Sequence, residues 1–391
     1  MLELSSLTRN FEVPSNRLYL RRDTFVRKGE KIIDLVSGNV NSHGIHFPED
    51  ILKRAFTKAL QKTKIYQPDP LGQIEARESI SRYYAEEGLH VPASQIVVTP
   101  GTSFSYWYAF KVLANPGDEI LAPAPSYPLF DSIAQLSGVK LVSYRMHERS
   151  RWEIDFDQME SAITARTKAI ILISPHNPTG AVATSDEVQR LSALASRKGL
   201  PIIADEVFSS FLFNLSRLPR PAHHAAPLVI TLNGFSKMLA LPGLKIGWMA
   251  LTGGSSLVRK ALTALEMISD TFLPVNEVAQ ALVRPLLRES KSFQSSYRSE
   301  IGLRLELATD LIMKGMNASF IRPEGGFFLS LSIQKRGVEE EALACRLLEM
   351  KRILVHPGYF YDMEGSHIVL SFVSRPRVLR NAFNAVIEEI R

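Results

Sequence analysis

The sequence predicts an α/β protein with a large unit, a mainly parallel seven-stranded sheet covered by helices, and a smaller α+β unit. Between residues 95 and 251, short β-branched runs alternate with helical segments, as in parallel sheets with helices on both faces. After residue 314, strands and helices mix without that regularity. We therefore expect residues 1–45 to be an N-terminal arm and the first part of the small unit. Residues 46–285 would form the large unit and 286–391 the rest of the small one.

The strands of the large sheet are predicted where apolar and β-branched residues cluster between turn signals. They are expected at 95–99, 119–122, 140–144, 169–174, 201–205, 228–232 and 245–251. An apolar stripe predicts a helix at 49–64, and a capping box of Thr184 and Glu187 starts one at 185–198. Further helices are predicted at 254–268, 275–289, 291–314, 338–350 and 376–390, and small-unit strands at 31–36, 327–333, 353–356 and 367–372.

Composition excludes several classes of protein. The net charge is +6 and the pI about 9.3, but positive and negative residues are interleaved, so we predict no nucleic-acid partner. No apolar run approaches the roughly 18 residues of a membrane helix, and the N-terminus lacks the apolar stretch of a secretory signal. The single cysteine, Cys345, cannot form an internal disulfide. These features favour a cytoplasmic location without membrane association.

The most informative stretch is Asn233-Gly234-Phe235-Ser236-Lys237, which follows the predicted strand 228–232. A lysine next to apolar residues at a strand end can be partly desolvated, which makes its amine a candidate nucleophile. Taken alone, this lysine could equally be a solvated surface cation.

This stretch resembles the lysine signature of the class I/II aminotransferases, the fold-type I, aspartate aminotransferase-like enzymes that use pyridoxal 5'-phosphate (PLP). Their pattern is Ser-x-Ser/Ala-Lys, with a second cation eight residues on in a Pro-Gly-Leu-Arg-x-Gly-Trp context. Lys237 takes the place of the Schiff-base lysine here, Ser236 precedes it, and Lys245 takes the place of the second cation. The resemblance covers roughly residues 30–375, with five motifs in the family's order.

The phosphate of PLP is expected at Val98-Thr99-Pro100-Gly101-Thr102-Ser103, which ends one strand and begins a helix. Helix N-termini bind anions through free backbone amides. The resemblance assigns Gly101, Thr102 and Ser103 to the phosphate, with Lys245 as an additional cation.

Other motifs correspond to the ring of PLP. Asp205 ends the apolar run Ile202-Ile203-Ala204 and matches the carboxylate that keeps the ring nitrogen protonated. Asn177, in Ser174-Pro175-His176-Asn177-Pro178-Thr179-Gly180, matches the amide that donates to the phenolate oxygen. Tyr127 occupies the position of the stacking aromatic residue, and Tyr106 is a second candidate.

Two loops are given a role by the resemblance alone. Tyr66, in Tyr66-Gln67-Pro68-Asp69-Pro70-Leu71-Gly72, matches the tyrosine that reaches the neighbouring subunit's phosphate, which implies a homodimer. The turn around Gly38 is expected to touch the carboxylate end of the substrate.

The sequence departs from the family pattern at several positions. Gly234 replaces a phosphate-binding Ser, Phe208 replaces a Tyr that bonds the phenolate oxygen, and Val369 replaces the Arg that binds the substrate carboxylate. His367 would lie on the same side of that strand as Val369, and Arg375 follows it, so either could compensate. Alternatively, the substrate presents no α-carboxylate at this place.

The predicted reaction is transfer of an amino group between an amino acid, or a related amine, and a 2-oxo acid, with Lys237 and Asp205 as catalytic residues. Alternatives on the same scaffold are a carbon–sulfur β-lyase, a decarboxylase, and a non-catalytic PLP-binding protein. A PLP-sensing regulator would need an N-terminal DNA-binding domain, for which about thirty residues leave no room. No metal is predicted, because His176 and the pair His223-His224 lack a matching cluster of ligands.

Overall fold

The computed structural model describes residues 5, 8, 16–314, 318–333 and 339–390. The predicted arm therefore lies largely outside the described residues, as does the first residue of the helix predicted at 338–350. The largest feature is an eight-stranded sheet in the order β2 (Ile96–Thr99), β9 (Gly247–Gly253), β8 (Leu228–Gly234), β7 (Ile202–Asp205), β6 (Thr167–Ile173), β3 (Glu119–Ala124), β4 (Lys140–Glu148) and β5 (Trp152–Ile154).

All seven predicted strands are present, and β5 is an eighth that the sequence did not predict. Strand β4 continues to Glu148 and turns back, so that β5 pairs with its end in antiparallel fashion, Glu148 opposite Trp152. A three-residue strand is too short to carry a recognisable alternation of its own. It forms because β4 offers a free edge next to it.

The direction of the strands places several loops at one edge of the sheet. Strands β8, β7, β6, β3 and β4 pair in parallel, while β9 runs antiparallel to β8 and to β2. Strand β2 therefore runs in the same direction as β8. In such sheets ligands bind at the carboxyl ends of the strands, so the segments after β2, β3, β6, β7 and β8 are brought together there.

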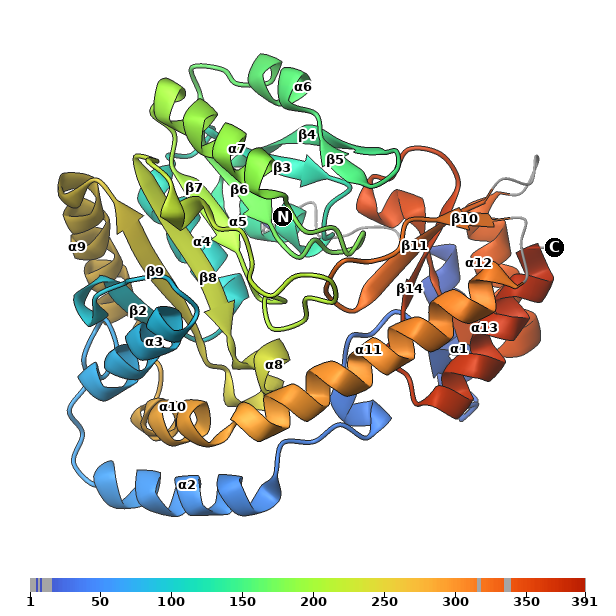
Figure 1. The fold of residues 1–391 in the computed structure, drawn as a ribbon, viewed down its shortest axis with the longest axis horizontal. Helices are drawn as coiled ribbons and strands as arrows, with labels where there is room; N and C mark the ends of the chain where they lie inside the picture. Colours follow the sequence, from blue (N-terminus) through green and yellow to red (C-terminus); the bar gives the residue numbers. More distant parts are fainter. Residues whose placement is uncertain (1–4, 6–7, 9–15, 315–317, 334–338, 391) are drawn as a thin grey trace.

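Alternate residues of the central strands pack against different helices. In β6, Ile171 and Ile173 pack in a cluster with α4 (Thr102–Leu113), α5 (Leu129–Ser137) and α9 (Ser255–Phe272). Ile170 and Leu172 face α6 (Phe156–Ser161) and α7 (Ser185–Lys198) instead. Figure 1 shows α7 in front of the sheet with α4 and α5 behind it. Both faces are thus buried, as expected for a parallel sheet.

The predicted capping box at the start of α7 is present. Thr184 accepts from the backbone of Glu187, and the Glu187 side chain accepts from the backbone of Thr184. A third apolar cluster packs β2 and β9 against α2 (Glu49–Lys62), α3 (Ile74–Glu86) and α10 (Glu277–Glu289).

The smaller unit contains a four-stranded antiparallel sheet with the order β10 (Ala318–Phe320), β11 (Phe328–Ile333), β14 (His367–Ser371) and β13 (His356–Pro357). A parallel pair joins β1 (Ile33–Asp34), from the N-terminal part, to β12 (Ile353–Leu354). The helices α12 (Glu340–Lys351) and α13 (Pro376–Ile390) complete it.

One helix of the N-terminal part was not predicted. Helix α1 (Arg17–Arg27) buries only Leu18 among its residues, so its apolar stripe is too weak to indicate a helix. It begins at Asn16, whose side chain accepts from the backbone of Leu18, and it packs against α12.

The long helix α11 (Lys291–Met313) follows α10 and runs diagonally toward the small sheet (Figure 1). One continuous apolar cluster joins this helix and the small sheet to Phe208, Phe211 and Ala240 of the large unit. The expected boundary between residues 285 and 286 falls inside α10.

Candidate active site

A cavity of about 870 Å³ lies where the carboxyl edge of the large sheet faces the small unit. It is lined by residues of both units: Tyr19, Gly38, Thr102, Ser103, Tyr106, Tyr127, Asn177, Asp205, Phe208, Ser236, Lys237, Phe328, His356 and Tyr361. Most of the site residues predicted from the sequence therefore lie around one cavity. A second cavity, of about 720 Å³, lies between α3, α10 and α11 and contains none of them.

Lys237 lies one residue after Ser236 in the short helix α8 (Phe235–Met238), which follows β8 directly. Burial lowers the pKa of its amine to about 8 because an ammonium group is poorly solvated there. The Phe208 and Phe327 rings lie 5.8 and 5.9 Å from its Nζ. A side chain at Gly38 would place its Cβ 3.4 Å from Nζ, so the glycine leaves room around the amine.

Asp205 is the last residue of β7 and is buried. Its Oδ1 accepts a 2.9 Å hydrogen bond from the backbone N–H of Val207, and its Oδ2 accepts a 2.8 Å bond from the Tyr106 hydroxyl. Burial raises the pKa of the carboxyl, and the two hydrogen bonds oppose that shift. Such a carboxylate is held rigidly and would gain from a cationic partner in the cavity.

The N-terminus of α4 opens into the same cavity through Thr102 and Ser103. Gly101 precedes the helix with a φ of 116°, a conformation that favours glycine. A Cβ at Gly247 would lie 2.8 Å from the Gly101 Cα, so the loop packs directly on the β9 backbone. The first amides of α4 have no acceptor within the helix and can bind an anion.

The departure at Gly234 has a steric reason. A Cβ there would lie 2.7 Å from the carbonyl oxygen of Ile246 and 2.9 Å from the Cα of Gly247. The family's serine therefore cannot be accommodated without moving β9.

Asn177 and Tyr127 come from the loops after β6 and β3. The Asn177 Oδ1 is buried and has no hydrogen-bond partner among the described residues. Tyr127 is partly exposed, and its ring contacts Phe130 at 6.1 Å. His176, beside Asn177, is buried, and burial lowers its pKa to about 3, so it is neutral. Its Nδ1 lies 2.9 Å from Thr179 Oγ1.

Five of the predicted residues do not line the cavity, and one of them, Gly101, directly precedes Thr102 of the lining. Lys245 is exposed, with a left-handed backbone, and Tyr66 is 69% exposed on the surface. His367 is buried, and its Nε2 lies 2.9 Å from Glu148 Oε2. Arg375 is exposed and packs near Gly44. The geometry therefore gives no support to a role of His367 or Arg375 in the cavity.

Tyr19, His356 and Tyr361 line the cavity but were not predicted from the sequence. Tyr19 lies on the unpredicted helix α1, His356 lies in β13, and Tyr361 ends the 3-10 turn Gly358–Tyr361. His356 is the last residue of the strand predicted at 353–356. A titratable residue at a strand end was the signal in the sequence that could have indicated a site residue there.

Comparison with known proteins gives the family. The family model described as aminotransferase class I and II matches residues 30–384. The chain belongs to the class I and II aminotransferases. The glutamate-pyruvate aminotransferase AlaA of Haemophilus influenzae is 30% identical over 343 residues, which are 85% of this chain and 83% of that protein. The arginine–pyruvate transaminase of Pseudomonas aeruginosa is 28% identical, over 91% of this chain and 89% of its own.

Solved aminotransferase structures share the whole fold. An alanine aminotransferase from Pyrococcus furiosus superposes with a TM-score of 0.92 at 25% identity, covering 99% of both chains. An Escherichia coli aminotransferase gives 0.90 at 26% identity, covering 100% of this chain and 98% of its own. The predicted family and fold class are confirmed, and this aminotransferase is a PLP-dependent enzyme.

The cavity of this aminotransferase fits PLP. It contains an amine with a lowered pKa, a buried carboxylate, a helix N-terminus and the side-chain amide of Asn177, whose N–H groups can donate. These groups match the aldehyde, ring nitrogen, phosphate and phenolate oxygen of the cofactor.

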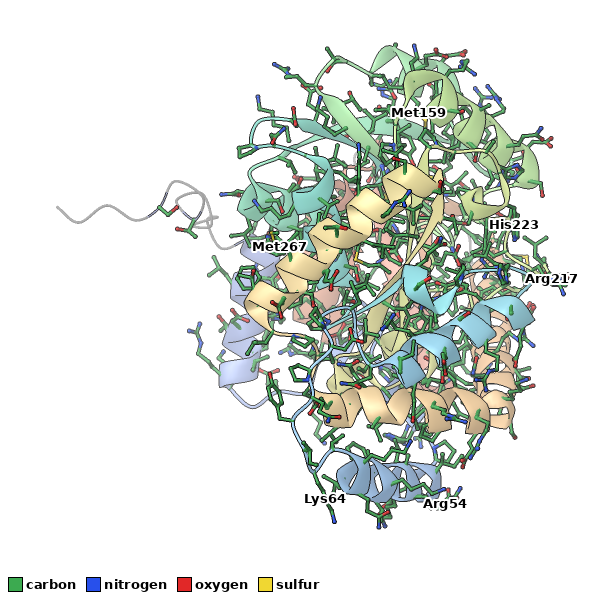
Figure 2. All side chains as sticks on the ribbon, turned by 90° about the vertical axis from the view of Figure 1, so that its left-hand side faces the viewer. Arg54, Lys64, Met159, Arg217, His223 and Met267 are labelled. Atoms are coloured by element: carbon green, nitrogen blue, oxygen red, sulfur yellow. The ribbon has the colours of Figure 1, made fainter. Side chains whose placement is uncertain are left out.

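Two further observations concern metal and membrane. Within the described ranges, no group of three or more His, Cys, Asp or Glu side chains is arranged to hold a metal ion. His223 lies on the exposed surface, where Figure 2 labels it. Among the described helices, none combines the length and apolar character needed to cross a bilayer.

Proposed function

We propose that this cavity is the site of amino transfer and that Lys237 is its catalytic amine. The observation that carries the proposal is the position of Lys237: its lowered-pKa amine lines the same cavity as the buried carboxylate of Asp205. A neutral amine is available near neutral pH only if its ammonium form is destabilised, and burial does this here.

The other residues would hold the cofactor. Asp205 would bind the ring nitrogen, Asn177 the phenolate oxygen, and Gly101, Thr102 and Ser103 the phosphate, with Tyr127 against the ring. Ser236 would position Lys237, while Lys245 would contribute only long-range charge from its exposed position. When bound, PLP supplies an electron sink for the pair left by the substrate's α C–H bond.

Lys237 Nζ would move the proton. In this role the free amine would take the proton from the substrate's α carbon as a general base and would then deliver it, as a general acid, to the cofactor carbon that carries the nitrogen. Phe208 and Phe327 exclude water from its surroundings, which keeps the pKa of the amine low.

The substrates are proposed from chemistry and from relatives. The relatives named above transfer amino groups between amino acids and pyruvate. We propose an amino acid, or a related amine, as donor and a 2-oxo acid as acceptor. A cytoplasmic location is proposed from the single cysteine, Cys345, which is free and buried.

A homodimer is proposed from the surface around Tyr66. Large apolar side chains are exposed in the segment of Tyr66, on α4, and on and just after α9: Ile65, Tyr66, Phe104, Met267, Phe272 and Leu273. Figure 2 faces this side and labels Met267 on α9 and Lys64 next to Ile65. Exposed apolar residues in such number are typical of an interface. In the dimer, Tyr66 would reach the partner's phosphate site. We also propose that residues 46–285 form one domain. The two chain ends, residues 1–45 and 286–391, would together form the other.

The test of the function is amino transfer by the PLP-loaded protein. With a panel of amino acids and amines as donors and pyruvate or 2-oxoglutarate as acceptor, we expect a new amino acid from the acceptor. Lys237→Ala should lower the rate at least ~1,000-fold, since it removes both nucleophile and base. Lys58→Ala, on exposed α2, is the matched control. An unchanged rate in Lys237→Ala would refute the assignment.

The same assay separates the rival reactions. Release of ammonia with a thiol would indicate a carbon–sulfur lyase, and release of carbon dioxide a decarboxylase. Transamination conserves the amino nitrogen, so the amount of aminated acceptor should equal the amount of donor consumed.

A further inference from the structure

The register of the small sheet places a histidine next to the position where the family's carboxylate-binding arginine is missing. Strand β13 pairs with β14 so that His356 lies directly opposite Val369. Directly opposed residues of an antiparallel pair point to the same face, with Cβ atoms about 4.5–5.5 Å apart. Val369 itself is covered by Trp152, Ala181, Tyr361 and Met363.

His356 is the centre of a hydrogen-bonded chain. Its Nε2 lies 2.7 Å from the Tyr19 hydroxyl, and its Nδ1 lies 2.9 Å from the Tyr361 hydroxyl. All three residues line the cavity that contains Lys237. They come from α1, β13 and the end of the 3-10 turn after β13. This chain, the Tyr19–His356–Tyr361 triad, therefore forms one wall of the active site.

The triad is uncharged at neutral pH. Burial lowers the pKa of His356 to about 4; Asp34 opposes this shift, and Arg22 adds to it. The Arg22 Cζ lies 4.3 Å from the Tyr19 ring centroid, and Arg22 pairs with Asp23 at 2.7 Å. The Asp34 Oδ1 accepts from the backbone of Val36 and Ser37.

Two further groups beside the triad are a carboxylate and a phenol, so neither supplies a cation. Glu340 of α12 is occupied by the backbone amides of Gly358, Tyr359 and His367. Tyr127 is a neutral phenol, because burial raises its pKa, and the backbone N–H of the preceding Ser126 bonds the Tyr361 carbonyl oxygen at 2.8 Å. Among the described residues that line the cavity, none is an arginine.

Hydrogen-bond counting shows what the triad can bind. A neutral imidazole has one N–H and one bare nitrogen. One tyrosine must therefore donate its proton to the bare nitrogen, and only the other keeps an O–H for the cavity. A protonated imidazole donates from both nitrogens, which frees both hydroxyls and adds a positive charge.

We propose that the Tyr19–His356–Tyr361 triad replaces the missing arginine as the subsite for the substrate's polar end. With a neutral His356 the triad binds a neutral group, and it binds a carboxylate only when His356 takes up a proton. An amide or a hydroxyl group of the substrate can bond both the one O–H donor and the one acceptor oxygen that the neutral triad offers the cavity. A carboxylate needs several donors or a cation when desolvated. This inference rests on the proposed function, because it makes the triad part of the amino-transfer site.

The proposal makes proton uptake the signature of carboxylate binding. His356 would accept one proton from solvent as the carboxylate enters, and release it when the ligand leaves. Above the histidine's own pKa, the apparent Kd of a carboxylate should then rise about tenfold per pH unit. The Kd of an isosteric amide should stay constant.

The test uses 3-phenylpropionate and 3-phenylpropionamide, which lack an amine and so need no chemistry. Their Kd values are measured by titration calorimetry on the PLP-loaded protein from about pH 6 to about pH 8.5, where the charge of neither compound changes. We expect the acid-to-amide ratio of Kd values to rise at least ~50-fold over that range. Because the ratio is used, any pH effect common to both compounds cancels.

Variants assign the effect to the triad. His356→Gln keeps a donor and an acceptor but cannot titrate, so the ratio should become independent of pH. Tyr19→Phe and Tyr361→Phe should each weaken binding by about 5–10-fold. Tyr359→Phe is the matched control, since its hydroxyl bonds to Asn16 outside the cavity, and it should behave as wild type.

Three outcomes would overturn the proposal: a flat ratio in the wild type, a slope that survives in His356→Gln, or binding of neither compound. Failure of the amino-transfer function is seen separately. It would leave the pH-dependent ratio intact while no donor aminates the acceptor.

Discussion

The Tyr106 hydroxyl donates a 2.8 Å hydrogen bond to Asp205 Oδ2, although the residues are 99 positions apart in the chain. Tyr106 lies on α4, within two helical turns of Thr102 at the predicted phosphate site, and Asp205 is the last residue of β7. The bond therefore couples the helix that would hold the phosphate to the carboxylate that would hold the ring. Both groups are buried, which strengthens a bond to a charged acceptor.

Removing this hydroxyl should weaken the cofactor site. In Tyr106→Phe, the Asp205 carboxylate loses a donor that lowers its pKa, so its interaction with a cationic ring nitrogen weakens. Hydrogen bonds to charged groups contribute about 1.5–3 kcal/mol; we expect the Kd for PLP to rise roughly tenfold or more. Tyr108→Phe is the control, because Tyr108 is buried on the same helix and does not line the cavity. Equal effects of both variants would contradict this role of Tyr106.

Restoring the family's serine should fail at position 234. Gly234→Ser brings a Cβ against the Ile246 carbonyl oxygen and the Gly247 Cα, and overpacking of this kind costs about 1–3 kcal/mol. We expect a lower Tm and no gain in affinity for PLP, measured by thermal unfolding and equilibrium titration. At Gly243 a Cβ meets no atom within 4 Å, so Gly243→Ser should leave the Tm unchanged. Tighter PLP binding by Gly234→Ser would contradict this prediction and would show that β9 can move to accommodate the side chain.

The reactivity of Lys237 toward PLP should report its lowered pKa. The neutral amine is the nucleophile, and its pKa is about 8, so the rate of PLP addition to cofactor-free protein should rise with pH and level off above that value. Stopped-flow absorbance gives the rate at each pH. A midpoint near 10.4, the value of an ordinary lysine, would contradict burial of the amine. Lys237→Ala should show no saturable addition.

The buried ion pair beside the site should be costly to break. Arg220 Nε lies 2.9 Å from Glu206 Oε2, and both side chains are almost completely buried. Arg220→Met leaves the Glu206 carboxylate buried without its partner, which should lower the free energy of unfolding by about 3–5 kcal/mol. Denaturant unfolding measures the change. The double variant Glu206→Leu with Arg220→Met should recover most of the loss; no recovery would mean that Arg220 stabilises by packing alone.

Much of the large unit could be predicted because its signals are local. Each of its seven predicted strands is an apolar run. The capping box of Thr184 and Glu187 indicates the start of α7 within four residues. Asp205 and Asn177 directly follow such runs, and a parallel sheet brings strand ends to one edge. The family resemblance assigned these two residues and Lys237 to one cofactor, and all three line the cavity.

The expectations that found no support in the cavity concern the small unit and the surface. His367 was chosen because it shares a strand face with Val369, but its ring turns to Glu148, a residue 219 positions away. Lys245 was assigned from the family pattern, and it is exposed, with a left-handed backbone. In both cases a contact distant in sequence, or a local backbone angle, decided where the side chain points.

The sequence by itself determined the fold class, the family and the order of the groups around the lysine, because these depend on local patterns and on motifs with fixed spacing. Only the tertiary structure decided that Tyr106 bonds Asp205, that Gly234 packs on β9, and that His356 stands opposite Val369 between two tyrosines. Strand register is set by the packing of the whole sheet face and not by the residues of one strand. A one-residue shift would have turned His356 away from the site.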